Sequence, residues 1–243
     1  MKVLRVTAEG LTTSFRYPHF MLGIQPTFEM PPPATIYGHI CSAIGEWIDP
    51  EEVLFAYHFT HEGKFDDVEH IHVLAAAGGK LPGTVMPKVL EGAVNPYKRT
   101  IFFKPKLVLY INKPEWLQYF YSPRYPVALG RSQDLFTYTD IQIVDLCKKE
   151  DAYFEHTLAP YEFSMKTARG YSVLMPRFLD YSKGRAPTFE RYVVLNQRIH
   201  TTDSQEFLKV AAEQYWVDAS MPVNKGVNLG LLFHGFTGGR GGK

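Results

Sequence analysis

The sequence predicts an α+β fold, and three features of its first half support this. Apolar and polar residues alternate over residues 4–8, as in a half-buried strand. Apolar residues recur at helical spacing over 36–47, and two segments of apolar and β-branched residues, 53–59 and 68–75, follow. The order strand, helix, strand, strand is that of the first part of a ferredoxin-like unit.

A run of three prolines, residues 31–33, leads into the predicted helix. Proline fixes φ and removes a backbone donor, so the chain runs extended and rigid up to the helix. Ile36, Ile40 and Ile44 then share one face over about three turns, and Gly45 lies where the helix would stop. Because a helix needs no such leader, we expect the prolines to hold the preceding loop in place.

That loop, residues 8–25, is polar and aromatic and has no apolar periodicity. Arg16, Tyr17 and His19 offer a cation, an aromatic ring and an imidazole within a few residues. Single-stranded RNA is bound by bases that stack on aromatic side chains and by arginines on phosphates, so the loop is a candidate RNA contact. A surface loop with one arginine is also common in proteins that bind no RNA.

Charge is segregated along a chain whose formal net charge is only +1. Acidic residues crowd residues 46–69, and basic residues follow over 80–106. This distribution fits an RNA contact on one face and protein contacts elsewhere. Solvated faces that merely happen to segregate are the alternative.

The two cysteines, Cys41 and Cys147, form neither a CxxC pair nor a disulfide framework, which is typical of a reducing compartment. No apolar run approaches the length of a membrane span, and the first residues do not resemble a signal peptide. We therefore expect a soluble, cytoplasmic protein.

The middle of the chain interrupts the α+β pattern. Residues 76–99 hold four glycines and three prolines without periodicity, which predicts a long loop that is either functional or disordered. A strand over 100–111, a short helix over 114–121 and a strand over 135–146 complete a first domain, residues 1–147.

Residues 148–243 are predicted to form a smaller, β-rich region. Basic and aromatic residues are scattered over 160–200, a second amphipathic helix is expected at 203–215, and a last strand at 226–236. The glycine-rich tail that follows has no core-forming residue.

Three stretches in this order, SFRYP, PPPATIYGHICSAIGEW and ALGRSQDL, together resemble the Cas-five family of CRISPR-associated proteins, most closely its type I-B branch. Members of that family are subunits of the Cascade surveillance complex. The resemblance is strongest over residues 1–75, recurs at 127–135 and is looser in the last third. It implies a ferredoxin-like (RRM-like, RAMP-type) domain with a thumb-like insertion, followed by a smaller β-rich region.

For function, the resemblance implies a non-catalytic subunit, without cofactor or metal, that binds and caps the 5′ handle of the guide RNA. Its partners would be the guide RNA, the Cascade backbone and large subunits and, indirectly, target DNA. The chemistry of the loops and the resemblance together give the expected RNA-binding residues, which are Arg16, Tyr17, His19, Gln25, Lys98, Arg99, Gly130, Arg131, Ser132, Lys166 and Arg169.

Two of these assignments have open alternatives. In the turn 130–132, backbone amides, the Arg131 guanidinium and the Ser132 hydroxyl can converge on a phosphate, but Arg131 can equally pair with Asp134. The insertion 76–99 can pack as a thumb against the backbone subunit, as the resemblance implies, or be a disordered insertion.

Three other readings of the chain stay open. Histidines at 58, 61, 70 and 72 could hold a metal, although no cysteine joins them. Some type I-C relatives cut the guide precursor with a tyrosine, a lysine and a histidine, and Tyr17 and His19 could supply two of the three. A scaffold that binds only proteins would leave the basic segments without a role.

Overall fold

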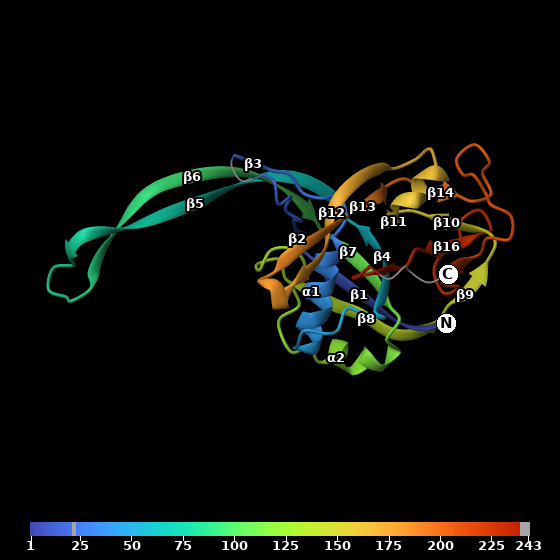
Figure 1. Cartoon of the computed structure of the whole chain (residues 1–243), viewed down its shortest axis with the longest axis horizontal. Coiled ribbons are helices and arrows are strands. Elements are labelled where there is room, and N and C mark those ends of the chain that lie inside the picture. Colours follow the sequence, from blue (N-terminus) through green and yellow to red (C-terminus); the bar gives the residue numbers. More distant parts are fainter. Residues whose placement is uncertain (21–22, 239–243) are drawn as a thin grey trace.

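The protein consists of a body and a long arm (Figure 1). The computed structural model describes residues 1–20 and 23–238, with the backbone alone for 75–77 and 89–92. The described part is mostly β, with two short α-helices. Neither helix is long and apolar enough to cross a membrane. Most of the glycine-rich tail, residues 239–243, lies outside the described residues.

A five-stranded antiparallel sheet organises the body, with the strand order β17-β4-β7-β1-β8. Without β17, the elements follow one another as β-α-β-β-α-β, and the spatial order places the first strand between the third and the fourth. The elements of this unit are β1 (Lys2–Gly10), α1 (Pro33–Ile44), β4 (Leu54–Thr60), β7 (Lys106–Ile111), η1 (Pro114–Trp116), α2 (Leu117–Tyr121), β8 (Phe136–Asp145) and β17 (His234–Gly235).

Helix α1 begins and ends where the sequence predicts. Pro33 is its first residue, and Ile36 and Ile40 are fully buried against the sheet. Gly45 ends the helix with a φ of 97°, a left-handed conformation that favours glycine, and its N–H donates to the Cys41 carbonyl at 2.7 Å. The rigid leader and this C-cap together determine the length of the helix.

Strand β1 is buried on both faces, whereas the sequence predicted a half-buried strand. Its Leu4 and Val6 lie in the core beneath α1. On the other face, Arg5 Nη1 donates to Asp218 Oδ2 at 2.7 Å, and the Tyr110 hydroxyl donates to the same oxygen at 3.1 Å. The prediction was wrong because a distant segment, not solvent, covers this face of the sheet.

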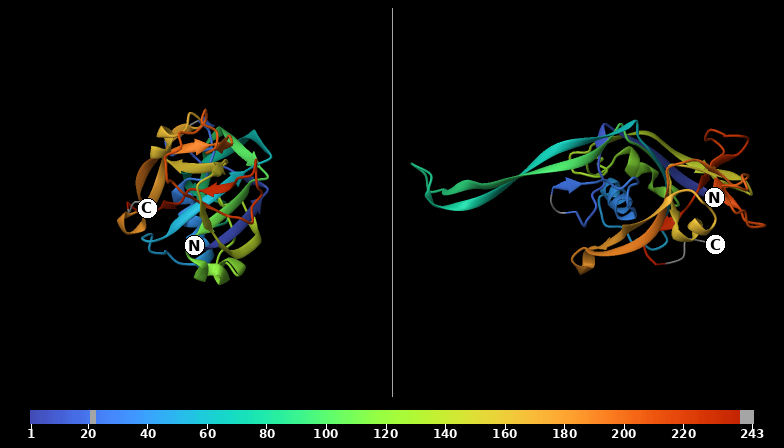
Figure 2. Two further views of the ribbon diagram at one scale, coloured as in Figure 1. Left: turned by 90° about the vertical axis from the view of Figure 1, so that its right-hand side faces the viewer. Right: turned by 90° about the horizontal axis from the view of Figure 1, so that it is seen from above.

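The carboxyl-terminal region wraps around the β4 edge of the sheet (Figure 2). Its strands form two small sheets, β14-β10-β16-β15-β9 and β11-β13-β12. They are β9 (Cys147–Lys149), β10 (Ala152–Phe154), β11 (Thr157–Pro160), β12 (Tyr171–Asp180), β13 (Ala186–Leu195), β14 (Ile199–His200), β15 (Tyr215–Val217) and β16 (Asn228–Leu231). Two short 3₁₀ helices, η2 (Tyr161–Met165) and η3 (Tyr181–Lys183), join them.

One hydrophobic core spans residues on both sides of position 147. Leu158, Tyr192 and Phe236 belong to the same buried cluster as Leu4 and Ile36. The division into domains at residue 147 stays a prediction, and the two regions share buried apolar surface.

The arm is a hairpin of β5 (Gly63–Lys80) and β6 (Pro87–Phe103), paired from Gly63 opposite Phe103 to Lys80 opposite Pro87. The expected structureless loop at 76–99 is therefore wrong: this segment holds parts of both strands and their turn. The predicted strand at 68–75 does form, but it lies in β5 of the arm and not in the central sheet. Strand signals beyond it were missed because most of the arm is exposed, so no alternation of buried and exposed residues is required. At the base of the arm, the short strands β2 (Thr12–Thr13) and β3 (Ile24–Gln25) pair with β6.

The predicted helix at 203–215 does not form, because the backbone N–H groups of this segment do not all donate to carbonyls four residues earlier. The Phe207 N–H donates to the Asp203 carbonyl at 2.9 Å, as in a helical turn, but the Leu208 N–H donates to Lys166 at 2.7 Å. Ala212, with a φ of 62°, then turns the chain away. Phe207 and Tyr215 are buried in a core cluster of the carboxyl-terminal region that also contains Phe154 and Leu195, whereas Leu208 and Val210 are exposed.

The last predicted strand, 226–236, is two short strands in different sheets. Strand β16 pairs with β10 and β15, whereas β17 pairs with β4. The segment thus connects the carboxyl-terminal region to the edge of the central sheet.

Two buried histidines predict an acid-sensitive fold. Burial lowers the pKa of His58 and of His234 to about 4, although each ring lies 2.9 Å from a carbonyl oxygen, of Glu155 and Leu158 respectively. The unfolded chain therefore binds more protons, and the stability that neutral histidines provide is lost as the pH falls from about 6.5 towards 4. We expect about 2 kcal/mol per histidine between about pH 7.5 and 5.

Urea denaturation at both pH values measures this loss. His234→Gln, which can still donate to the Leu158 carbonyl, is expected to reduce the dependence on pH by the share of one histidine, about 2 kcal/mol. A dependence identical to that of the wild type would contradict the role of His234.

Candidate nucleic-acid interface

A groove of about 550 Å³ lies between the first turns of α1, the turn at 128–132 and the β12–β13 hairpin. Figure 1 shows this hairpin crossing in front of α1. The groove brings together segments that are far apart in the sequence. Among its lining residues are Arg16, Gly130, Arg131, Ser132, Arg185 and Phe189.

The lining of the groove is basic and aromatic. No aspartate or glutamate is among the described residues that line it. The Arg185 guanidinium lies 5.5 Å from the centre of the Tyr181 ring, and no ion pair of Arg185 occurs within the described residues. Phe189 has 38% of its surface exposed. A cation beside exposed rings suits a phosphate and a stacked base.

His39 of α1 holds the turn against the helix. Its Nδ1 lies 2.9 Å from the Ala128 carbonyl, and its Nε2 lies 3.1 Å from the Tyr138 hydroxyl. Burial lowers the pKa of His39, so the ring is neutral near pH 7. A neutral ring that donates from Nδ1 can accept the Tyr138 hydroxyl at Nε2, which satisfies both nitrogens.

The turn itself requires a glycine. Gly130 has a φ of 99°, and a Cβ at this position would lie 2.8 Å from the Ser14 carbonyl oxygen. Any side chain would therefore be strained by the backbone conformation and would also collide with Ser14. This close approach keeps residues 130–132 against the loop that carries Arg16.

Arg131 is paired with carboxylates, which is the alternative that its sequence context left open. Its Nε and Nη2 donate to the two Asp134 oxygens at 3.0 and 2.7 Å, and its Nη1 donates to Glu69. The Asp134 side chain is fully buried. In this structure the Arg131 guanidinium neutralises two acidic groups and stabilises the turn.

We therefore expect Arg131→Ala to destabilise the fold. The substitution leaves the Asp134 carboxylate buried without its partner, and such a loss costs about 3–5 kcal/mol. Arg169→Ala is the control, because it breaks an ion pair whose arginine is half exposed, and such surface pairs contribute about 0–1 kcal/mol. Urea denaturation of both variants measures the difference, and equal losses would argue against a structural role for Arg131.

The loop residues expected to bind RNA lie at different depths. Arg16 is exposed and lines the groove. The Tyr17 ring stacks on Phe28 with 3.7 Å between centroids, and burial raises the pKa of its hydroxyl. The His19 ring is exposed and lies 6.1 Å from that of Phe189, so it borders the groove.

Gln25, Lys98 and Arg99 lie at the base of the arm. Gln25 is buried and pairs with Arg99 across the parallel strands β3 and β6, and its Oε1 has no hydrogen-bond partner among the described residues. Lys98 pairs with Asp66 at 2.8 Å, and Arg99 pairs with Glu69 at 2.7 Å. None of the three lines the groove.

Lys166 and Arg169 lie in the carboxyl-terminal region and do not line the groove. Lys166 pairs with Glu213. Arg169 pairs with Glu206 at 2.7 Å and donates to Gln197 at 2.8 Å. Both side chains join segments of the carboxyl-terminal region to one another.

Among the residues of the groove that sequence reasoning missed are Tyr181, Arg185 and Phe189. Their signal was the basic and aromatic composition of residues 160–200, but composition does not tell which of these side chains face α1. Among the described residues, no group of three or more His, Cys, Asp or Glu side chains could hold a metal ion.

Comparison with known proteins finds similarity in structure only. No family model and no curated protein matches the sequence. A chain of a structure described as a CRISPR RNA-guided surveillance complex superposes with a TM-score of 0.51 at 14% identity, over 84% of this chain and 95% of that one.

Two further structures match with lower scores. One is a CRISPR protein from Archaeoglobus fulgidus, with a TM-score of 0.45 at 12% identity over 90% of this chain and 97% of that one. The other is a chain of the Type III-B Cmr-beta complex bound to cognate target RNA, with a TM-score of 0.47 at 13% identity over 82% and 86%. The protein thus shares its fold with a chain of an RNA-guided surveillance complex.

Proposed function

We propose that this protein is a non-catalytic subunit of a CRISPR RNA-guided surveillance complex and that it binds the 5′ handle of the guide RNA in the groove beside α1. The observation that carries the proposal is the groove: Arg185 and the exposed rings of Tyr181 and Phe189 meet Arg16 of a distant segment there, and no aspartate or glutamate is among the described residues that line it. The fold shared with a chain of such a complex supports the same function.

The central unit is, in this proposal, the ferredoxin-like domain of a Cas-five protein of type I-B. Its strand order and the two helices support this assignment. RNA recognition on the open sheet face, as in an RRM, is not available here, because Asp218 and its neighbours cover that face. The groove on the α1 side is therefore the better candidate for RNA.

The arm is the thumb of this proposal and would pack against the neighbouring backbone subunit. It projects far from the body (Figure 2), and its side chains Val68, Leu74 and Val85 are more than half exposed. Apolar side chains on a free hairpin need a partner to bury them. The remaining partners, the large subunit and indirectly the target DNA, follow from the same family assignment.

Arg185→Ala is expected to weaken binding of the guide RNA about tenfold or more. A hydrogen bond to a charged group contributes about 1.5–3 kcal/mol, and Arg185 has no carboxylate partner among the described residues. Arg169→Ala is the matched control, since it removes the same charge from an ion pair outside the groove. Fluorescence anisotropy with labelled repeat RNA at fixed salt measures both.

Equal effects of the two variants would place the RNA outside the groove. Phe189→Leu adds a second test, since it keeps an apolar side chain and removes the ring on which a base would stack. No binding of repeat RNA by the wild type would favour a scaffold that contacts proteins alone.

An endoribonuclease is the second candidate, because Tyr17 and His19 lie next to the groove. We expect no cleavage, because the Tyr17 ring is half-buried and stacks on Phe28. Wild type, Tyr17→Phe and His19→Ala are each incubated with labelled repeat RNA and EDTA. A general acid or base contributes about 10²–10⁴ in rate, so a discrete product that disappears in either variant would establish catalysis.

A further inference from the structure

The groove beside α1 has an apolar wall on the side of the β12–β13 hairpin. Four of its lining residues pair across the two strands, Pro176 with Phe189 and Leu179 with Pro187. Residues directly opposite each other in an antiparallel pair share one face, and Phe189 and Pro187 are two positions apart on one strand. All four side chains therefore belong to the same face of the hairpin, the one that lines the groove.

Helix α1 forms the opposite wall. Ala34, Gly38 and Ser42 follow one another at intervals of four residues and line the groove. They extend about 12 Å along the helix axis, at about 1.5 Å per residue. Their side chains are short, so the helix backbone lies close to the surface of this wall.

The cations of the groove lie towards its two ends. Arg185 lies at the hairpin tip beside Tyr181, whose ring stacks on Trp47, beyond the carboxyl end of α1, with 3.3 Å between centroids. Arg16 belongs to the loop that borders Phe189, at the other end of the hairpin face. The guanidinium of the turn at 128–132 also lines the groove, but it is paired with carboxylates. A phosphate is therefore favoured at the ends of the groove and not between its apolar hairpin face and α1.

Gly38 lies midway along the α1 wall, and neither its conformation nor its packing requires a glycine. Its φ is not in the left-handed region, unlike that of Gly45. Apart from its chain neighbours and the helix backbone around it, no atom of the described residues lies within 4 Å of where its Cβ would be. A glycine in a helix interior destabilises the helix relative to alanine. Its presence indicates that a ligand approaches the helix backbone at this point.

We propose that the groove holds one unpaired base of the guide RNA, which lies flat on α1 at Gly38. The Phe189 ring and the rest of the hairpin face cover the other side of the base, and the phosphates before and after it reach Arg185 and Arg16. This inference rests on the proposed function and adds to it the class of RNA, a single strand in which one base is turned out of the stack. A base that is paired within a duplex cannot reach α1, because the hairpin packs on this side of the helix.

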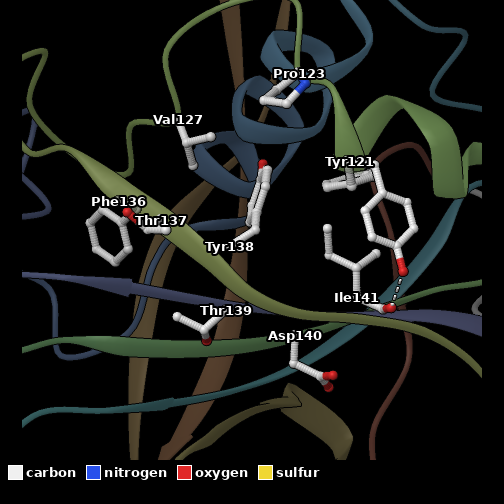
Figure 3. A pocket seen from close by; sticks show the side chains of 10 residues that line it. Tyr121, Pro123, Val127, Phe136, Thr137, Tyr138, Thr139, Asp140 and Ile141 are labelled. Atoms are coloured by element: carbon white, nitrogen blue, oxygen red, sulfur yellow. Dashed lines mark hydrogen bonds between the residues drawn. The ribbon is translucent and has the colours of Figure 1, made fainter.

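The cavity beside β8 lacks this combination of groups. It measures about 370 Å³, and Tyr121 and Tyr138 offer it aromatic rings (Figure 3). However, no lysine or arginine is among the described residues that line it. A base could stack there, but no cation of the lining would bind its phosphate, so the groove is the better site.

Two substitutions of Gly38 test the contact, with the full-length protein and labelled repeat RNA. Gly38→Leu places a side chain in the groove and is expected to weaken binding about tenfold or more, the contribution of one stacked base. Gly38→Ala adds only a Cβ, and alanine favours the helix, so the urea midpoint is expected to rise while RNA binding weakens. Gly63→Leu is the matched control, because a Cβ there also meets open space and Gly63 does not line the groove.

The position of the base in the RNA is found with repeat RNAs that each lack one base. At one position, removal of the base is expected to weaken binding to the wild type about tenfold. The same removal is expected to leave binding to Gly38→Leu unchanged, because that variant has already lost the contact. Repeat RNA annealed to its complement is expected to bind more weakly than the single strand.

Four results would overturn the base site. These are unchanged RNA binding by both Gly38 variants, an equal loss in Gly63→Leu, no RNA position whose effect disappears in Gly38→Leu, and equal binding of the duplex. Arg185→Ala tests the proposed function by itself, so these four results would leave that function standing. No binding of repeat RNA by the wild type would overturn both.

Discussion

The carboxylate of Glu69 joins the arm to the body, and the arrangement of the groove depends on it. It accepts hydrogen bonds from Arg99 of the arm and from Arg131 of the turn. Although partial burial disfavours its charge, the two guanidiniums hold the pKa of Glu69 below its usual range. Arg131 in turn binds Asp134, and His39 joins the same turn to α1. One network thus sets the positions of the arm, the turn and the helix relative to one another.

The carboxyl-terminal region decides which surfaces of the central sheet are left for binding. It buries the face that carries Arg5 and Tyr110, and its β12–β13 hairpin packs on α1. What remains open is the groove between this hairpin and the turn at 128–132, together with the outer edge of β8. A compact domain of this strand order without the added region would expose its sheet instead. The two open surfaces are therefore a consequence of how the second half of the chain folds back on the first.

Elements whose structure depends on residues close by in the sequence were predicted correctly. Elements whose structure depends on contacts with residues far away in the sequence were not. The apolar face of α1, its proline leader and Gly45 are local signals, and the structure has the helix where they place it. The segment at 203–215 has the same kind of spacing, yet Leu208 donates to Lys166 and the helix does not form. Apart from the strand predicted at 68–75, the arm lacked a signal because a free hairpin needs no buried face and its two strands pair with each other.

The sequence predicted only part of the candidate site, because it does not show which cations are paired with carboxylates. Arg16 and the glycine turn were found because they combine residue types within a short stretch, and both line the groove. Lys98, Arg99, Arg131, Lys166 and Arg169 were chosen as cations, and each pairs with a carboxylate. An ion pair presents little net charge to a phosphate, so a basic stretch of sequence does not by itself locate an RNA contact. A cation that lacks a carboxylate partner and lies beside an exposed ring is a better candidate for such a contact. Among the described residues of the groove, Arg185 beside Tyr181 meets this condition.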